Sequence, residues 1–468
     1  MKKLAILAVL ACMVFGFAAS ASAVDLDAKG KFQFQMNIMD NSEFLSAKDG
    51  GQAEDDMRFY FRARAQFRFI ANENLWGVLY TEYRTMYGTG GANNGAGGSG
   101  THGNLGVKNA YLQYRFPGTE VLTTAGRINL NLPGAASGNM ILGDTDTDVF
   151  MIETPITDQI AIAGAFVRLQ DLNANDTPGW GGDGIEVNDE LDAFYAALPV
   201  TIDGIAATPY FLYANAGKNI NAVAGLQGPA ATAYTKNFGA WWLGTSFEMD
   251  MFDPIVFAAD LAYGSVDADQ KQNDRDGFFM DASLAYTGLD FVKPKLVFAY
   301  STGEDDDTDN GSERMPVIAN NFAFGTSYFG GGAFTGNVDI NSDQQIGMWV
   351  LGLQLEEISF IEKLSHDVNF LFIKGTNDAD LVKNAPAAGL SNISADGTFL
   401  TDEDTAIEID FTTRYQIYDE LSAVVELAYV AVDFDNDTWE NSNVANAKAR
   451  GDNEDPLLKC VVGLMYSF

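Results

Sequence analysis

Apolar residues recur at every second position through most of this chain, in about eighteen segments of roughly 8 to 16 residues each. The clearest segment is RFYFRARAQFRF at 58–69. Successive side chains of a strand point to opposite faces, so four arginines share one face here and phenylalanine and alanine share the other. The pattern predicts an all-β fold.

The connections between these segments alternate in length along the chain. Turns such as Pro117-Gly118 and Asp203-Gly204 are short, whereas loops such as 131–146 and 302–343 are long and polar. Short turns at one end and long loops at the other are typical of a transmembrane barrel, whose strands need about 9 to 11 residues to cross a bilayer. The sequence therefore predicts a transmembrane antiparallel β-barrel of about 16 to 18 strands.

The first 23 residues differ from the rest of the chain. Lys2 and Lys3 precede an apolar run, and Ala21-Ser22-Ala23 matches an Ala-x-Ala cleavage site. These features indicate a secretory signal peptide, because the apolar run is shorter than the roughly 20 residues of a membrane-spanning helix. We expect residues 1–23 to be cleaved and residues 24–468 to form a single transmembrane β-barrel domain.

Composition excludes several classes of function. The chain has 64 Asp and Glu against 28 Lys and Arg, a net charge of −36, so it should repel nucleic acid. Cys460 is the only cysteine after the leader, which excludes internal disulfides and cysteine-rich metal or haem sites. His102 and His366 are the only histidines, and no catalytic triad is visible. We expect no cofactor, no metal and no enzyme activity.

The arginines of 58–69 decide which face meets lipid. An arginine facing lipid at mid-bilayer costs about 2 to 4 kcal/mol in a barrel, so four on that side approach about 10 kcal/mol. The total stability of a fold is often no larger. We therefore expect the arginines to face the lumen and the phenylalanines to face lipid. A closed sheet of this size encloses an aqueous channel.

The last segment, LKCVVGLMYSF, alternates apolar residues and ends in Tyr466 and Phe468. It resembles the terminal strand that the barrel-assembly machinery recognises in outer-membrane proteins. With the leader and the loop pattern, the chain resembles the trimeric porins of Gram-negative bacteria, and more narrowly the branch found in anaerobic sulfate-reducing bacteria. The resemblance implies export through the periplasm to the outer membrane, a homotrimer, and contact with membrane lipid and lipopolysaccharide.

The same resemblance implies a pore constriction. Members of the family place an arginine cluster on early strands, and their third long loop folds into the barrel. In this chain the third long loop reads NLPGAASGNMILGDTDTD. A basic wall would then face an acidic loop across the narrow point and set a transverse field. The wall residues implied are Arg58, Arg62, Arg64, Arg84 and Arg127, with Glu82 on the same face as Arg84, and the loop residues are Asp144, Asp146 and Asp148.

These features predict a water-filled channel for passive diffusion of small hydrophilic solutes and ions. One alternative is a solute-selective channel with an anion or sugar site, which Trp76 and Tyr80 on the lumen face favour. An outer-membrane enzyme or adhesin is the other. Further residues that share the lumen face are mixed in sign and indicate no selectivity: Lys293, Lys295, Asp260, Asp281, Glu408, Asp410, Arg414 and Glu426.

Two loop segments suggest binding sites only weakly. The glycine-rich segment 88–104 lacks the Gly-Lys-Ser/Thr ending of a phosphate-binding loop. The resemblance implies that it is a second loop that latches onto a neighbouring subunit. The run EDDDTD at 304–309 does not have the spacing of a twelve-residue calcium loop. A solvated acidic loop, or cation bridging to lipopolysaccharide, remains open for it.

Overall fold

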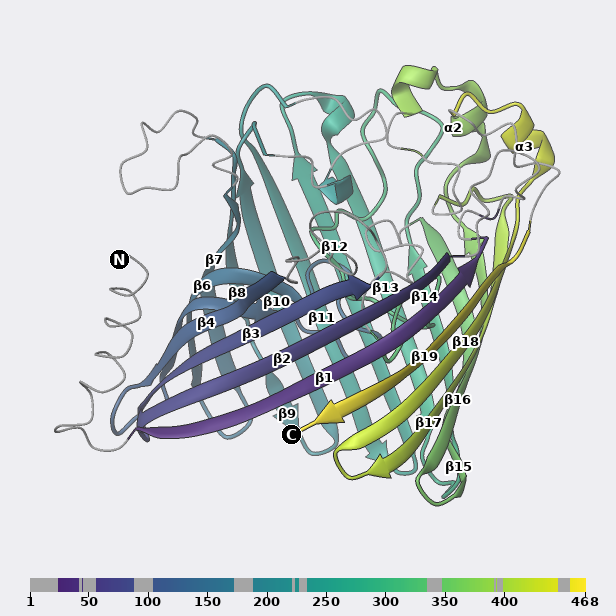
Figure 1. Ribbon diagram of the computed structural model, residues 1–468. Coiled ribbons are helices and arrows are strands. Elements are labelled where there is room, and N and C mark those ends of the chain that lie inside the picture. The colour runs from purple at the N-terminus through teal and green to yellow at the C-terminus, as the bar shows by residue number, and fades with distance from the viewer. Residues whose placement is uncertain are drawn as a thin grey trace, which may run out of the picture.

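One β-sheet closes on itself to form the body of this protein (Figure 1). The computed structural model describes residues 24–41, 44, 56–87, 104–171, 188–220, 224–226, 234–334, 347–390, 393, 399–444 and 455–468. The expected signal peptide at 1–23 lies outside these residues. The strands are β1 (Asp25–Asp40), β2 (Asp56–Asn72), β3 (Leu75–Tyr87), β4 (Asn104–Arg115), β5 (Leu122–Leu130), β6 (Thr145–Pro155), β7 (Ala161–Asp171), β8 (Glu190–Ala197), β9 (Val200–Ile202), β10 (Ile205–Ala216), β11 (Phe238–Phe252), β12 (Ile255–Asp267), β13 (Arg275–Tyr286), β14 (Lys293–Ser301), β15 (Met348–Ile361), β16 (Leu364–Gly375), β17 (Thr405–Tyr418), β18 (Leu421–Asp433) and β19 (Leu457–Ser467).

Neighbouring strands of the sheet run antiparallel, and the first strand pairs with the last. Phe32 of β1 lies opposite Ala63 of β2 on one side and Tyr466 of β19 on the other. β8 and β9 pair with different parts of β10 and together occupy one strand position in the barrel. The barrel therefore has 18 strands. Because closure leaves no strand edge, the backbone hydrogen bonds are satisfied within the sheet, as a hydrocarbon environment requires. The predicted antiparallel barrel of 16 to 18 strands is confirmed.

The two faces of the barrel wall differ in polarity, in the order opposite to that of a water-soluble protein. On β1, Gln33, Gln35 and Asn37 point inward and are each 4% exposed. Phe32 and Phe34 alternate with them and are 40% and 41% exposed on the outside. The same alternation on β17 places Glu408 inside and Ile407 outside. An apolar outer face with a polar inner face is the pattern of a membrane barrel with an aqueous interior.

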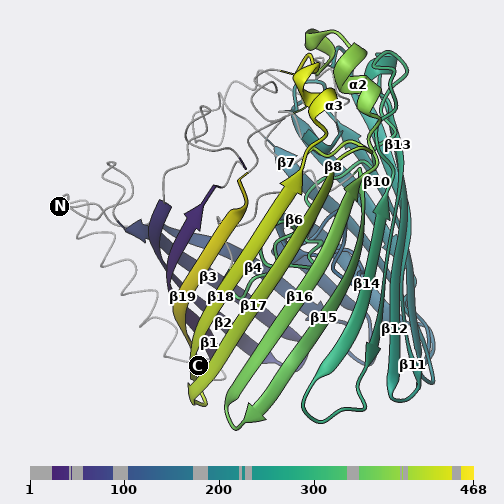
Figure 2. The same ribbon diagram turned by 90° about the vertical axis from the view of Figure 1, so that its right-hand side faces the viewer.

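The connections follow the predicted alternation of turns and loops. Short turns and both the start of β1 and the end of β19 lie at one end of the barrel (Figures 1 and 2). The long loops lie at the other end, where they carry the short helices α2 (Ala379–Asn384) and α3 (Asn436–Glu440). No helix in the described ranges is long and apolar enough to cross a membrane.

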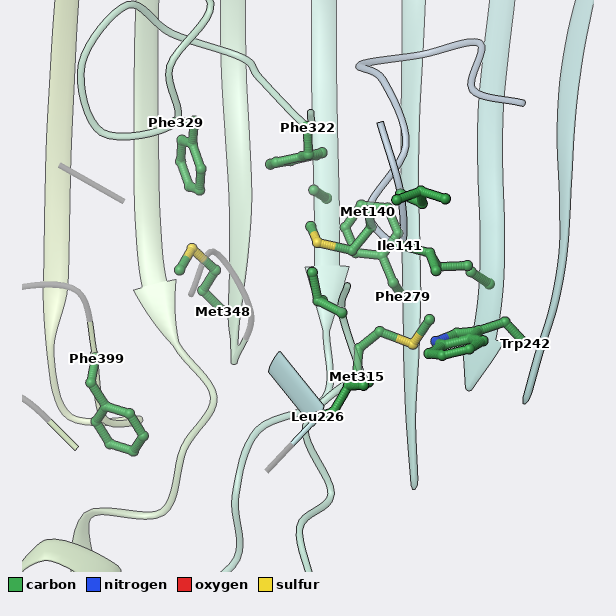
Figure 3. Close-up of a cluster of buried hydrophobic side chains, with 14 of the residues drawn as sticks. Met140, Ile141, Leu226, Trp242, Phe279, Met315, Phe322, Phe329, Met348 and Phe399 are labelled. Atoms are coloured by element: carbon green, nitrogen blue, oxygen red, sulfur yellow. The ribbon is translucent and has the colours of Figure 1, made fainter. Parts of the chain in front are cut away.

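An apolar cluster lies inside the barrel, where two loops that fold inward pack against the wall. The third long loop (131–144) and the described part of the seventh (302–334) bring Met140, Ile141, Met315 and Phe322 together (Figure 3). These side chains pack against wall residues such as Trp242 of β11 and Phe279 of β13. The inward fold of the third loop was predicted. The inward fold of the seventh was not.

Candidate pore constriction

The four arginines that we call the arginine wall, Arg58, Arg62 and Arg64 of β2 and Arg84 of β3, lie on the inner face. Arg58 lies opposite Asn37, and Arg62 lies between Gln33 and Arg84 in the register of the sheet. Arg62 is 8% exposed, and its Nε donates to Oε1 of Gln33 at 2.8 Å. Arg84 is exposed on the same face. The inward placement of these arginines follows from strand alternation, on which the prediction was based.

Glu82 of β3 contributes a carboxylate to the arginine wall. It lies opposite Arg64, and Nε of Arg64 donates to Oε2 of Glu82 at 2.6 Å. The two side chains are 22% and 21% exposed. Glu82 therefore pairs with one of the four arginines and neutralises its charge.

Lys31 lies next to the arginine wall and was not among the predicted residues. Lys31 of β1 lies opposite Arg64 and interacts electrostatically with Arg62, Arg64 and Arg414 of β17. The basic region therefore extends across β1 and β2 to β17, past the seam where the barrel closes. Sequence alternation along β1 gave a signal for Lys31, because it shares a face with Gln33 and Gln35.

Below the arginine wall, toward the short turns, Arg68 and Trp76 form a second inward group. The Arg68 guanidinium lies 4.7 Å from the centre of the Trp76 ring. The Trp76 indole nitrogen donates to Oε1 of Gln113 at 2.7 Å. Because Arg68 covers one ring face and Gln113 occupies the ring nitrogen, Trp76 is engaged within the wall.

The third loop crosses the lumen and attaches to β12 and β13. The backbone N–H groups of Ala135 and Ala136 donate to the carboxylate of Asp260 at 2.7 to 2.9 Å. The hydroxyl of Ser137 donates to Asp281, which lies opposite Asp260 in the sheet. Two wall carboxylates therefore hold the loop in place.

The seventh loop attaches to β17 and β18 in the same way. Oε1 of Glu408 accepts from the backbone N–H groups of Thr326 and Ser327 at 3.0 and 2.8 Å, and Oε2 accepts from that of Tyr328 at 3.1 Å. Asp410 accepts from the N–H and hydroxyl of Thr326 at 3.0 and 2.9 Å. The other anchors of the loop are Glu426, which accepts from the N–H of Ala333, and Lys459 and Gln354, which donate to loop carbonyls.

The two inward loops also bind each other. The N–H of Asn139 donates to Oδ1 of Asn321 at 2.7 Å, and the N–H of Ile318 donates to the carbonyl of Ile141 at 3.0 Å. Gly138 adopts φ +102, and a Cβ there would lie 2.5 Å from the carbonyl oxygen of Asn321. Glycine is therefore required at this contact. The loops form one structure that occupies part of the lumen.

The three aspartates predicted to face the arginine wall from the loop lie elsewhere, and that prediction was wrong. Asp146 and Asp148 belong to β6, and Asp144, with φ 47, ends the loop and accepts from the side chain of Asn129. Asp146 accepts from Lys108 at 2.7 Å. The segment that does cross the lumen, LPGAASGNMILG at 132–143, carries no charge.

The prediction that Arg127 belongs to the pore constriction was also wrong. It lies opposite Asp148, with Nη1 and Oδ1 3.6 Å apart, and the two side chains are 46% and 59% exposed. Asp148 shares a face with Phe150, which is 52% exposed, while Thr147 and Val149 point inward. Arg127 and Asp148 therefore lie on the outer surface of the barrel. Near the loop end of β5 and β6, inward positions such as Leu130 and Val149 are apolar, because the inward loops pack against them.

Two loop predictions have different outcomes. The glycine-rich loop at 88–103, with His102, lies outside the described residues. In the run 304–309, Glu304 is buried, accepts from the Ser312 hydroxyl at 2.7 Å, and interacts with Arg314 and Arg275. Burial raises the pKa of Glu304 above its ordinary value. Among the residues that the structure describes, no group of three or more His, Cys, Asp or Glu side chains is placed to hold a metal ion.

The chain ends where the barrel closes. The N–H of Phe468 donates to the carbonyl of Gly30 at 3.0 Å, and the N–H of Gly30 donates back at 2.9 Å. Tyr466 and Phe468 are 42% and 51% exposed on the outer face. Their rings are 5.8 Å apart, and that of Phe468 lies 6.0 Å from Phe32. The aromatic end of β19 therefore lies outside the barrel at the turn end.

Comparison with known proteins gives matches at the level of structure alone. No protein-family model and no curated protein sequence matches the chain. OccAB3 of Acinetobacter baumannii matches with a TM-score of 0.53 and 11% identity over 94% of this chain and 100% of that one. OccK8 (OprE) of Pseudomonas aeruginosa matches with a TM-score of 0.52 and 9% identity over 95% and 98%, and OpdL of the same organism with 0.52 and 12% over 95% and 99%. The chain therefore has the closed 18-stranded fold of Gram-negative outer-membrane porins, as the sequence resemblance implied.

Proposed function

We propose that this protein is an outer-membrane porin, a water-filled channel through which small hydrophilic solutes and ions diffuse passively, with a basic constriction. The observation that carries the proposal is the polarity of the wall. Membrane-length strands expose phenylalanine, leucine and isoleucine outside and direct glutamine, asparagine and arginine inside. Such an interior is stable only in contact with water or with protein polar groups.

The charge exposed in the narrow region depends on which wall residues the loops cover. The inner-wall carboxylates Asp260, Asp281, Glu408, Asp410 and Glu426 accept hydrogen bonds from loop residues and are each at most 6% exposed. The arginine wall has Glu82 as a carboxylate partner, and Arg84 is exposed. We infer that the constriction favours anions, although the chain as a whole is acidic.

The engaged Trp76 favours a general channel over the sugar-binding alternative. A sugar platform needs an exposed aromatic face, whereas Trp76 is 8% exposed and Arg68 lies over one face of its ring. An enzyme is less well supported, because His366 hydrogen-bonds Thr413 at 2.9 Å and stacks on Phe411 near a turn. A channel with an anion-binding step remains compatible with the same arginines.

The remaining parts of the proposal concern assembly. The leader at 1–23 directs export through the periplasm, and Tyr466 and Phe468 are the signal read by the barrel-assembly machinery. In the outer membrane the protein contacts lipid and lipopolysaccharide and forms a homotrimer. The position of both aromatic side chains on the outer face at the turn end supports the assembly role.

Planar-bilayer recording in a KCl gradient tests the channel. The variant Arg62→Ala/Arg64→Ala removes two charges from the arginine wall. The control Lys293→Ala/Lys295→Ala removes the same charge from a site where both lysines are paired, with Glu357 and Glu356. We expect the zero-current potential to move toward cations in the first variant and to stay near wild type in the second. Absence of conductance would overturn the pore. A zero-current potential of Arg62→Ala/Arg64→Ala equal to that of wild type would overturn the basic constriction.

A further inference from the structure

Exposed carboxylates surround the mouth of the barrel at the turn end. Because the sheet is closed, its eight short turns form a ring around the lumen (Figures 1 and 2). Each of these turns carries at least one exposed Asp or Glu. We call these nine residues the turn ring: Glu73, Glu120, Asp158, Asp203, Asp253, Asp290, Glu362, Asp419 and Glu420.

The turn ring is more acidic than turn formation requires. Aspartate favours tight turns because its side chain bonds the local backbone, whereas glutamate has no such preference. Four members of the ring are nevertheless glutamates: Glu73, Glu120, Glu362 and Glu420. On these turns, all of which the structure describes, Lys363 is the one basic residue. Glu120 lies 4.0 Å from Arg115 in an exposed pair, which offsets little of the charge. The turn ring therefore keeps a net negative charge.

The turn ring and the arginine wall lie at different heights of the same lumen. Glu73 follows Arg64 by nine residues, which is about 30 Å along the strand at roughly 3.4 Å per residue. Because strands of such barrels tilt by about 35 to 45°, the separation along the barrel axis is about 20 to 25 Å. The loop end also carries exposed carboxylates, such as Asp307 and Asp437. The basic level of the lumen therefore lies between two acidic mouths.

Salt controls how far the field of the turn ring extends. The Debye length is about 3 Å in 1 M salt and about 30 Å in 0.01 M salt. Adjacent turns are two strands apart, about 10 Å. In 1 M salt the carboxylates are therefore screened from one another, whereas in 0.01 M salt their fields add across the mouth and reach the arginine wall. Partly buried charges are screened less, and Arg62 is 8% exposed, so the arginine wall acts at both salt levels.

We propose that the turn ring opposes the arginine wall in the selection of ions, and that ionic strength sets the balance between the two. At high salt the arginine wall decides, and anions are favoured. At low salt the turn ring attracts cations to the mouth and repels anions from it, so the preference for anions is lost. This inference rests on the proposed channel and assigns part of its selectivity to residues outside the constriction.

Planar-bilayer recording at one fixed KCl ratio, with mean concentrations of about 1 M and about 0.01 M, tests the turn ring. The variant Glu73→Gln/Glu120→Gln/Glu362→Gln/Glu420→Gln removes four charges and keeps the aspartates that shape the turns. In wild type we expect the anion-to-cation permeability ratio to fall by about twofold or more at the lower concentration. In the variant we expect the wild-type ratio at the higher concentration and a smaller fall at the lower one.

Aspartate at the same four positions is the matched control, because it keeps the charge and should reproduce the wild-type fall. A wild-type ratio that is equal at both concentrations, or a glutamine variant whose ratio falls as far as that of wild type, would overturn the proposal. If the fourfold variant does not assemble, Glu73→Gln/Glu120→Gln and Glu362→Gln/Glu420→Gln should each give part of the effect, and no effect in either would overturn it.

The basic constriction can fail separately from the turn ring. Arg62→Ala/Arg64→Ala is compared with wild type at the higher concentration, where the turn ring is screened. An unchanged permeability ratio there contradicts the constriction, while the fall of the wild-type ratio with dilution still reports on the turn ring.

Discussion

Arg62 of β2 lies directly opposite Arg84 of β3, and both side chains point into the lumen. Like charges directly opposite on neighbouring strands destabilise a sheet by roughly 0.2 to 1 kcal/mol. The hydrogen bond from Arg62 to Gln33 satisfies part of the guanidinium but supplies no negative charge. The sheet therefore retains a concentration of positive charge on its inner face, at a cost in stability.

Replacing Arg84 by glutamate should change both selectivity and stability. Arg84→Glu gives Arg62 an acidic partner, so we expect a gain in stability of about 0.2 to 1 kcal/mol and a zero-current potential shifted toward cations. Unfolding in urea and bilayer recording measure the two effects. Lys293→Glu, with the same change of charge at a site near the turns, should shift the potential less. A loss of stability in Arg84→Glu would show that the two arginines do not repel each other.

Removing the carboxylate of the arginine wall should act in the opposite direction. Glu82→Gln leaves Arg64 without its ion-pair partner, so we expect stronger anion preference and a loss of stability of about 1 kcal/mol or less. The double variant Arg64→Ala/Glu82→Gln should return the zero-current potential toward wild type. A shift of Glu82→Gln toward cations contradicts this account of the constriction.

The seventh loop should loosen when its main anchor is removed. Glu408→Ala deprives Ser327 and Tyr328 of the acceptor for their N–H groups, and each buried unsatisfied donor costs about 1 to 3 kcal/mol. We expect higher and more variable conductance and faster proteolysis within 302–334. Glu408→Gln keeps one acceptor oxygen and should have a smaller effect. Glu356→Ala, which changes a wall carboxylate bonded to Lys295, should leave the loop protected.

The cap of α3 should weaken in acid. The side chain of Asp435 accepts from the N–H of Thr438 at 2.7 Å, and the bonds from Thr438 hold the pKa of Asp435 below its ordinary value. Because the folded-state pKa is depressed, the stabilisation is present above the unfolded pKa of about 3.9 and is lost as pH falls through the folded value.

Hydrogen exchange of 436–440 at neutral pH and near pH 3 measures this loss. Asp435→Asn keeps a capping oxygen that does not titrate, so its protection should change less between the two pH values. An equal pH dependence in wild type and Asp435→Asn would assign the change to other carboxylates.

The fold could be predicted because membrane strands repeat one rule along their whole length. Alternation from β1 to β19 and the sorting of turns and loops depend on lipid outside and water inside, so local sequence carries the information. The rule fails on β5 and β6, where the inward face touches protein. There Leu130 and Val149 point inward and Arg127 and Asp148 point outward. An apolar face does not identify the lipid side where a loop packs inside.

The aromatic content of the seventh loop is a sequence signal for its inward fold. The stretch NFAFGTSYFGGGAF at 321–334 is rich in aromatic residues, which an exposed loop seldom carries. Phe322, Phe324, Tyr328 and Phe329 are each at most 3% exposed inside the barrel. The anchors on β17 and β18 lie 82 and 93 residues away in sequence, so no local pattern identifies them.

The most direct test of the account measures which side of the wall meets water. In a Cys460→Ser background, Arg64→Cys and Ala63→Cys place single thiols on adjacent positions of β2. We predict that a charged, membrane-impermeant thiol reagent modifies Arg64→Cys and reduces its conductance, while Ala63→Cys reacts only with a lipophilic reagent. Modification of Ala63→Cys by the charged reagent, with Arg64→Cys protected, would contradict the assignment of lumen and lipid faces.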